Sequence, residues 1–242
     1  MIKVCCMGWA SAAPSQTEAD RYYFRYHGPE AVYWGGPWQV RYWTWKPRTT
    51  PQEAIERFGA QPIGFYTEIW HYRAEDAVET GQMPRPYTPQ PWEGKPAPDY
   101  ARFTIAAVPA LPTEDFLGAE PNPEEGPILR WISAFDYPEG VSLEDGEKWF
   151  LEVHSQEAKT QPGLLRYISH LSVDWLRERW PCTRISEMWY RNIDDWRKAV
   201  IESPPNYTLP PWGGEYPFVD MVSNFVDLKP DVDFLRGNYI IP

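Results

Sequence analysis

The sequence predicts an α+β fold in which two ferredoxin-like βαββαβ repeats within one chain face each other as a barrel-like core. Three observations predict it. Short sequence blocks recur in the same order in both halves of the chain. Each half shows the same succession of strand and helix patterns. An acidic, Pro-rich segment at residues 111–127 separates the halves.

The repeated blocks indicate a tandem duplication. The segments YTPQPWEG (87–94) and YTLPPWGG (207–214) share five of eight residues. Upstream of them, Glu68 and Trp70 match Glu187 and Trp189 at a separation of 119 residues. Two earlier pairs of blocks match at 125 and 127 residues: 40–43 with 165–168, and 20–27 with 147–154.

Residues 1–110 are expected to form the first repeat. Ser15 and Glu18 give a capping-box signature, and Tyr22, Tyr23 and Tyr26 follow at helical spacing. Apolar runs rich in β-branched and aromatic residues predict the strands. The expected order is strand 1–10, a helix from Ser15, strand 38–45, strand 64–70, helix 73–80 and strand 101–108.

Residues 128–242 are expected to form the second repeat, with 111–127 as the linker. Ser142 opens the first helix, which presents Trp149, Phe150 and Val153 on one face. The other expected elements are strand 127–135, strand 163–173, strand 183–189, helix 192–202 and strand 218–226. In each repeat the YT..PW.G loop then joins the second helix to the last strand.

Composition excludes several functions. The net charge of −11 argues against a nucleic-acid partner, which requires a basic face. No apolar run reaches 18 residues, so we expect no membrane span and no signal peptide. Three Cys residues form no even disulfide framework, which favours the cytoplasm. The duplication permits either a monomer or a homodimer.

The chain resembles the EthD-like branch of the dimeric α+β barrel superfamily. The resemblance rests on FRYHGP (24–29) with VRYW, on LEVHSQ (151–156) with LRYIS, and on the E-x-W pattern of TEIWHY and SEMWYR. Family members usually build the barrel from two chains, whereas this chain carries both halves. The resemblance implies a small-molecule partner, often aromatic, and chemistry that often needs no metal or organic cofactor.

Histidines are the first candidates for catalysis. His27 and His154 end matching helices, where each could act as a general acid or base or could bind helix-end carbonyls. His170 replaces Trp45 of the first repeat and shares a strand face with Arg166. This asymmetry favours the second repeat as the active half, although a hydrogen-bonded core His would give the same pattern.

Glu68 and Glu187 occupy the middle of otherwise apolar strands. A carboxylate among aromatic rings has a raised pKa, which suits a general base. The alternative is a structural ion pair with Arg41 or Arg166 on the neighbouring strand.

These candidates give a working hypothesis. A cofactor-independent enzyme, a lyase before an isomerase, moves a proton on a small aromatic or hydrophobic metabolite, with no metal bound. The alternatives are a cofactor-free monooxygenase and a non-catalytic ligand-binding protein. His154, His170, Glu187 and His27 are the candidate catalytic residues, with Arg166 and Tyr167 positioned to hold an oxyanion. The other substrate-binding candidates are Trp189, Glu68, Tyr42 and Trp212.

Overall fold

The computed structural model describes residues 1–9, 13–82, 88–89 and 102–237. Two five-stranded antiparallel sheets contain its strands, in the orders β10-β2-β3-β1-β4 and β5-β7-β8-β6-β9. The first sheet comprises β1 (Ile2–Trp9), β2 (Gln39–Trp45), β3 (Gly64–His71), β4 (Arg102–Pro109) and β10 (Val232–Asp233). The second comprises β5 (Glu114–Asp115), β6 (Leu129–Asp136), β7 (Arg166–Leu171), β8 (Arg184–Tyr190) and β9 (Asp220–Asp227).

The four long strands of each sheet have the same arrangement. The order β2-β3-β1-β4 in the first sheet corresponds to β7-β8-β6-β9 in the second. In both sheets the first strand of the repeat lies in the middle and pairs antiparallel with the third and the last. This is the ferredoxin-like topology that the sequence predicts.

A long helical segment covers the outer face of each sheet. In the first repeat it comprises α1 (Gln16–Tyr22), the π-helical turn η1 (Tyr23–His27) and α2 (Gly28–Gly35). In the second it comprises α5 (Leu143–Trp149), the π-helical turn η5 (Phe150–His154) and α6 (Ser155–Ala158). The Ser15 and Ser142 side chains accept hydrogen bonds from backbone N–H groups of the first turn, so both predicted caps are confirmed.

The second helix of each repeat is shorter. It is α4 (Ala74–Gln82) in the first repeat, and α7 (Ile193–Arg197) with the π-helical turn η7 (Lys198–Glu202) in the second. Short 3₁₀ turns complete the elements: η2 (Gly36–Trp38), η4 (Pro123–Glu125) and η6 (Asp174–Leu176).

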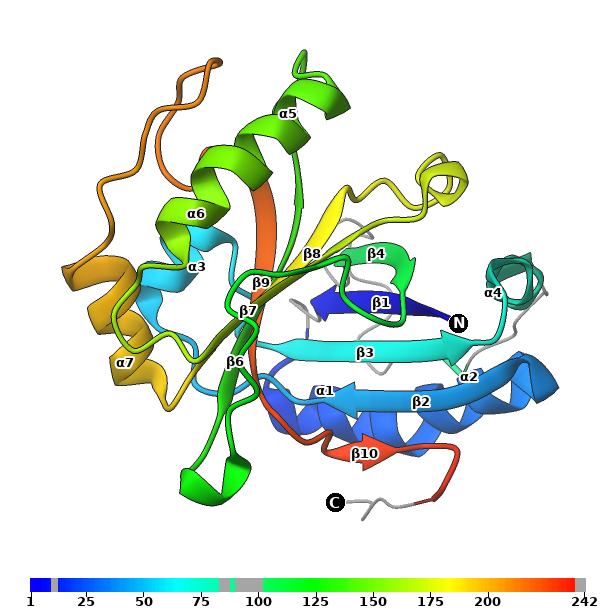
Figure 1. Ribbon diagram of the computed structural model, residues 1–242. Helices are drawn as coiled ribbons and strands as arrows, with labels where there is room; N and C mark the ends of the chain where they lie inside the picture. Colours follow the sequence, from blue (N-terminus) through cyan, green and yellow to red (C-terminus); the bar gives the residue numbers. More distant parts are fainter. Residues whose placement is uncertain (10–12, 83–87, 90–101, 238–242) are drawn as a thin grey trace.

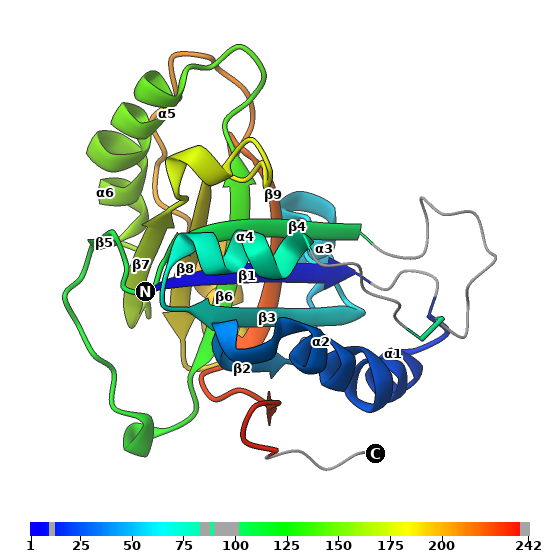
Figure 2. The ribbon, with the colours of Figure 1, turned by 90° about the vertical axis from the view of Figure 1, so that its right-hand side faces the viewer.

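The inner faces of the two sheets pack against each other. Their strands cross at a steep angle, with helices on the far side of each sheet (Figures 1 and 2). A shared core joins side chains from both repeats: Cys5, Met7, Trp45, Tyr66, Ala106 and Val108 with Ile132, Ala134, Cys182, Ile185 and Val226. The expected burial of one sheet face by the other is therefore confirmed.

The repeats also exchange short segments. β5 from the predicted linker pairs with β7, and the C-terminal β10 pairs with β2. Helix α3 (Gln52–Phe58), which leaves the first repeat between β2 and β3, packs Phe58 against Trp131 and Trp196 of the second. Gly59 ends α3 with φ 57°, and a Cβ there would lie 2.4 Å from the Met221 carbonyl oxygen.

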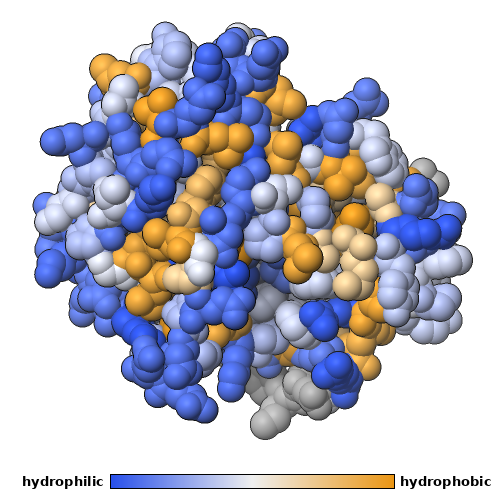
Figure 3. Space-filling view, in the orientation of Figure 1, coloured by the Kyte–Doolittle hydropathy of each residue, from blue (hydrophilic) through white to orange (hydrophobic). Residues whose placement is uncertain are grey.

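The sequence pattern does not predict α3, β5 or β10. Each gains its stability from a partner in the other repeat, and a local pattern does not carry that information. Among the described residues, no helix combines the length and apolar character that crossing a bilayer requires. Hydrophilic side chains cover most of the face in Figure 3, and hydrophobic ones lie between them in scattered groups.

Candidate active site in the second repeat

His154 ends a π-helical turn that sets the direction of its ring. The Ser155 N–H donates to the Phe150 carbonyl oxygen, five residues back. In an α-helix, residues five apart point about 140° away from each other. The wider π turn instead brings Trp149 and His154 together, with ring centroids 4.8 Å apart and planes 26° apart. The stacked Trp149 ring thus fixes the imidazole against the sheet.

A small cavity lies between this helical turn and the outer face of the second sheet. Strand alternation turns Trp131, Ser133, Ser186 and Met188 toward it. Its volume is about 40 Å³. Among the described residues that line it there is no Asp, Glu, Lys or Arg, and His154 is the one basic side chain. The lining residues are Trp131, Ser133, Phe135, Phe150, His154, Tyr167, Ser186, Met188, Tyr216, Pro217, Val219 and Met221.

The His154 ring is an uncharged base in this cavity, and one of its nitrogens has no hydrogen-bond partner among the described residues. Besides Trp149, it stacks on Tyr207 with ring centroids 5.2 Å apart. Its Nδ1 is buried and has no hydrogen-bond partner among the described residues. Burial lowers the pKa of His154 to about 4, and the Glu157 carboxylate only partly opposes this shift. At neutral pH the imidazole is therefore uncharged and free to accept a proton.

Hydroxyl groups supply the other polar atoms of the cavity. Tyr167, on β7, is 1% exposed, and burial raises the pKa of its hydroxyl, which stays protonated. The Ser186 hydroxyl hydrogen-bonds Ser169 at 2.8 Å, and the Ser133 hydroxyl lies 3.5 Å from the Ser186 carbonyl oxygen. The site thus combines one base with neutral hydrogen-bonding groups and aromatic walls.

The repeated YT..PW.G loop begins at Tyr207, whose ring stacks on His154, and it is attached to the helical segment. The Glu157 carboxylate accepts hydrogen bonds from the backbone N–H and the hydroxyl of Thr208, at 3.0 and 2.5 Å. Glu30 holds Thr88 in the same way in the first repeat, at 3.0 and 2.5 Å. The shared attachment explains why Thr recurs. The rest of the first loop, including Trp92, lies outside the described residues.

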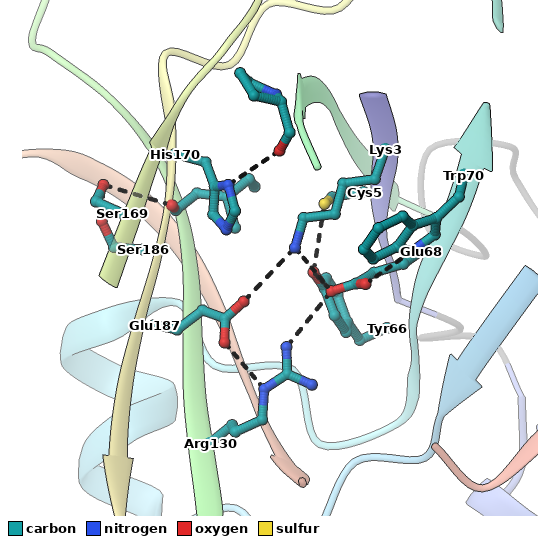
Figure 4. A network of polar contacts seen from close by, with 12 residues as sticks. Lys3, Cys5, Tyr66, Glu68, Trp70, Arg130, Ser169, His170, Ser186 and Glu187 are labelled. Atoms are coloured by element: carbon teal, nitrogen blue, oxygen red, sulfur yellow. Dashed lines mark hydrogen bonds and ion pairs between the residues drawn. The ribbon is translucent and has the colours of Figure 1, made fainter. Parts of the chain in front are cut away.

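A second polar cluster lies on the opposite face of the sheet, between the two repeats. Lys3 and Glu68 of the first repeat meet Arg130 and Glu187 of the second (Figure 4). The N–O distances are 3.1 Å for Lys3–Glu68, 3.9 Å for Lys3–Glu187, 3.5 Å for Arg130–Glu68 and 3.0 Å for Arg130–Glu187. Each carboxylate also accepts a hydrogen bond from a Trp two residues along its strand. We call these four residues the charge quartet.

The charge quartet corrects the expectation for the two Glu residues. Their cationic partners are Lys3 and Arg130, not Arg41 and Arg166. Burial disfavours the charged form of Glu187, but Arg130 and Lys3 outweigh it and lower its pKa to about 2. The pKa of Glu68 is also lowered. The predicted raised pKa is wrong because two buried cations neutralise the two carboxylates.

His170 lies beside the charge quartet, not with His154. β7 turns Tyr167 to the outer face and His170 to the inner face, 1% exposed. Its Nδ1 is 3.2 Å from the Pro109 carbonyl oxygen, and its Nε2 is buried without a partner among the described residues. Burial, with Lys3, lowers its pKa to about 4. The combined site expected from His154, His170 and Glu187 is therefore divided between two faces.

The remaining candidates of the second repeat lie outside the cavity. Arg166 and Trp189 are on the inner face, where the guanidinium lies 5.0 Å from the indole centroid and pairs with Asp115. Trp212 contacts Trp149, with ring centroids 5.0 Å apart, and does not line the cavity. Only His154 and Tyr167 of the predicted residues are thus brought together there.

The first repeat has different side chains at the matching positions. The Tyr23 hydroxyl hydrogen-bonds Tyr42 at 3.0 Å and Thr67 at 2.9 Å, and Phe65 packs 3.8 Å from its ring centroid. Burial raises the pKa of Tyr23 to about 12. His27 keeps its predicted place at the end of η1, with its ring centroid 5.0 Å from that of Tyr23. A hydroxyl cluster thus lies where the second repeat has Phe150 and its cavity.

Sequence reasoning missed the two cations and the polar cavity walls. Lys3 and Arg130 stand 127 residues apart in the first strand of each repeat, the same offset that relates His27 to His154. That match could have identified them. No group of three or more His, Cys, Asp or Glu side chains among the described residues is placed to hold a metal ion.

Comparisons with known proteins bear on the fold. No protein-family model matches the chain, and no curated protein matches it in sequence. An anthrone oxidase-like protein of solved structure is 9% identical, with a TM-score of 0.52 over 93% of this chain and 90% of that one. A chlorite dismutase from Candidatus Nitrospira defluvii is 9% identical, with a TM-score of 0.42 over 95% and 90% of the two chains.

A dye-decolorizing peroxidase from Bacteroides thetaiotaomicron is 8% identical, with a TM-score of 0.42 over 93% of this chain and 92% of that one. At such identities the likeness concerns the fold alone. The likeness to the anthrone oxidase-like protein and the matching strand order of the two sheets give the architecture. The chain has the fold of the dimeric α+β barrel class, with both halves of the barrel in one polypeptide.

Proposed function

We propose that the chain is a cofactor-independent enzyme that removes a proton from a small aromatic substrate at His154 and lets the resulting anion react with dioxygen. We also propose that it is a single-chain relative of the EthD-like branch. One observation carries the functional proposal: a neutral imidazole with an unpartnered, buried Nδ1 lines an aromatic cavity without charged side chains. Such a cavity suits a neutral, electron-rich ring.

Proton transfer begins the reaction. A pKa of about 4 makes His154 a weak base while the cavity is empty. The substrate anion formed beside it stabilises the imidazolium, so the pKa of His154 rises in step with the transfer. Tyr167 or a Ser hydroxyl donates a hydrogen bond to the oxygen on which the negative charge develops.

The oxygenation balances without another reactant. An activated ring CH₂ group loses one proton to His154, and the carbanion passes one electron to O₂. The two radicals combine into a peroxide anion at that carbon, which takes the proton back from His154 and becomes a hydroperoxide. Loss of water then breaks the O–O bond and leaves a carbonyl, so that R₂CH₂ and O₂ give R₂C=O and H₂O. The same balance converts a phenol to a quinone.

The cavity size indicates how the reactants enter. A volume of about 40 Å³ holds dioxygen or a few water molecules. A benzene ring needs on the order of 150 Å³. The substrate must therefore displace the wall formed by Tyr216 and Pro217, which belongs to the segment between η7 and β9.

Elimination, the main expectation from the sequence, shares the first step but is less well supported. An eliminating enzyme protonates its leaving group, and no carboxylic acid or ammonium group is among the described residues of the cavity. In oxygenation, His154 returns its first proton to the peroxide anion. It then takes the second C–H proton and passes it to the hydroxide that leaves as water.

Oxygen consumption tests the proposal. With anthrone or 1-naphthol at pH 6.5, corrected for the reaction without enzyme, we expect one O₂ consumed per carbonyl formed and one ¹⁸O atom retained from labelled O₂. The His154→Gln variant should lose about 10²-fold or more of the rate. His27→Gln, the matched change in the first repeat, should retain it.

The other outcomes have definite meanings. Full activity in His154→Gln refutes the assignment of the base, and loss of activity in His27→Gln alone moves the site to the first repeat. Product formation without oxygen consumption supports elimination. Saturable binding without any product supports a binding protein.

A further inference from the structure

A larger groove lies on the outside of Trp149, away from the His154 cavity. It runs between the helical segment α5–η5 and the loop after η7, which is the orange segment beside α5 in Figure 1. Its volume is about 570 Å³, within the range of small-ligand sites. Its lining residues are Gly140, Val141, Asp145, Lys148, Trp149, Glu152, Val153, Thr208, Leu209, Pro211 and Trp212.

The aromatic wall of the groove is held rigidly. The Trp212 Nε1 donates to the Phe218 carbonyl oxygen at 3.1 Å, and its ring meets Trp149 edge-on, with centroids 5.0 Å apart. Trp149 in turn stacks on His154. Because the indole is already fixed, a planar ligand can stack on it with little loss of side-chain freedom. Leu209, 66% exposed, adds an apolar side chain that the chain itself leaves open to solvent.

The charges of the groove favour a cation. Asp145 and Glu152 contribute two carboxylates against the single ammonium of Lys148, in a chain whose net charge is −11. The position of Glu152 in the first repeat is Arg25, so this carboxylate is specific to the second repeat. A carboxylate beside Trp faces is the combination that attracts organic cations.

We propose that this groove is a binding site for a planar aromatic cation, which stacks on Trp212 with its charge toward Glu152. The site goes beyond the proposed oxygenation, since binding there requires no turnover and no proton transfer at His154.

Calorimetric titration with N-methylquinolinium and its neutral parent quinoline at pH 7.5 tests the proposal. We expect the cation to bind about fivefold more tightly than quinoline, as a partly exposed cation–π contact predicts. Trp212→Ala should abolish binding, and Trp212→Phe should restore most of it. Trp175→Ala removes another exposed Trp, on η6, and should leave the affinity unchanged.

Glu152→Gln tests the charge separately from the ring. Glu152 is exposed, so the variant should fold normally. It should bind N-methylquinolinium no better than quinoline, while its affinity for quinoline stays that of the wild type. The proposal is overturned if wild-type protein binds N-methylquinolinium no better than quinoline, or if Trp212→Ala binds as wild type does. Because His154→Gln should bind the cation normally, failure of the oxygenation reaction leaves this test unaffected.

Discussion

His154 has a chemical role that its surroundings define. Stacking between Trp149 and Tyr207 buries the ring, and burial keeps it neutral. The sequence predicted its place at a helix end and its matching with His27. It did not predict the π-helical turn, because no residue pattern of this segment distinguishes a π turn from an α turn.

The pH dependence of catalysis follows from this environment. Protonated His154 cannot accept a proton, so kcat/KM, which reports the free enzyme, should fall as pH drops through about 4. The acid limb of kcat reports the enzyme–substrate complex and should lie no higher, because a neutral aromatic substrate brings no charge that would stabilise the imidazolium. Pre-steady-state and steady-state rates between pH 3.5 and 8 check both limbs. An acid limb of kcat/KM near 6.5 would contradict the buried environment of this ring.

The charge quartet permits a second prediction at the residue scale. Lys3→Met leaves two buried carboxylates facing one guanidinium, and should destabilise the fold by about 3–5 kcal/mol. The double variant Lys3→Met/Glu68→Gln keeps the close Arg130–Glu187 pair and removes one charge of each sign. It should be more stable than the single variant. Urea unfolding of both proteins measures the difference, and equal or lower stability of the double variant would contradict the neutralisation argument.

Strands and helices were more predictable than the contacts between them. The capping residues Ser15 and Ser142 and the apolar runs of β6 and β8, rich in β-branched and aromatic residues, are local signals. They located those elements correctly. Helix α3 was missed because Phe58 is buried against aromatic rings of the other repeat, among them Trp131 and Trp196. For candidates on strands, the sheet face followed from alternation. His154 lies on a helical turn, and tertiary packing decides which sheet face its ring contacts.

The attachment of the YT..PW.G loop to Glu157 gives a prediction at the scale of an element. Thr208→Val removes one charge-assisted hydrogen bond to Glu157 and should loosen the loop by about 1.5–3 kcal/mol. Amide exchange of residues 204–219 should accelerate, and the KM for an aromatic substrate should change. Thr88→Val makes the matched change at Glu30 and should leave exchange in 204–219 as in wild type. Equal effects of both variants on that segment would refute a local clamp.

At the scale of the whole molecule, the two repeats share one framework but differ in the side chains between the first helical segment and the sheet. Both repeats keep the strand order, the helix-end His and the Thr–Glu attachment of the loop. They differ where side chains meet the sheet: Tyr23 hydrogen-bonds Tyr42 in the first repeat, and Phe150 borders a cavity in the second. The charge quartet draws one cation and one carboxylate from each repeat, so each half is neutral by itself. The longer Arg130–Glu68 and Lys3–Glu187 contacts join the two halves.

The same architecture makes the stability of the molecule depend on pH in two separate windows. His154 and His170 both have folded-state pKa values lowered to about 4 from 6.5. The unfolded chain therefore binds protons first, and stability should fall as pH decreases from 6.5 to about 4, by on the order of 3 kcal/mol for each ring. The pKa of His170 is lowered by Lys3 and raised by Glu187 and Glu68. The pKa of His154 is raised by Glu157.

Glu187 should change the stability only in the second, more acidic window, below about pH 4.5. Its pKa is lowered from 4.5 to about 2, so the stability it provides is present above pH 4.5 and is lost as pH falls through about 2. Urea unfolding between pH 7.5 and 3 separates the two windows. His154→Gln and His170→Gln should each remove about half of the slope between pH 6.5 and 4. A slope unchanged in both variants would mean that other groups govern acid unfolding. A slope removed by His170→Gln alone would assign it to the interface between the repeats.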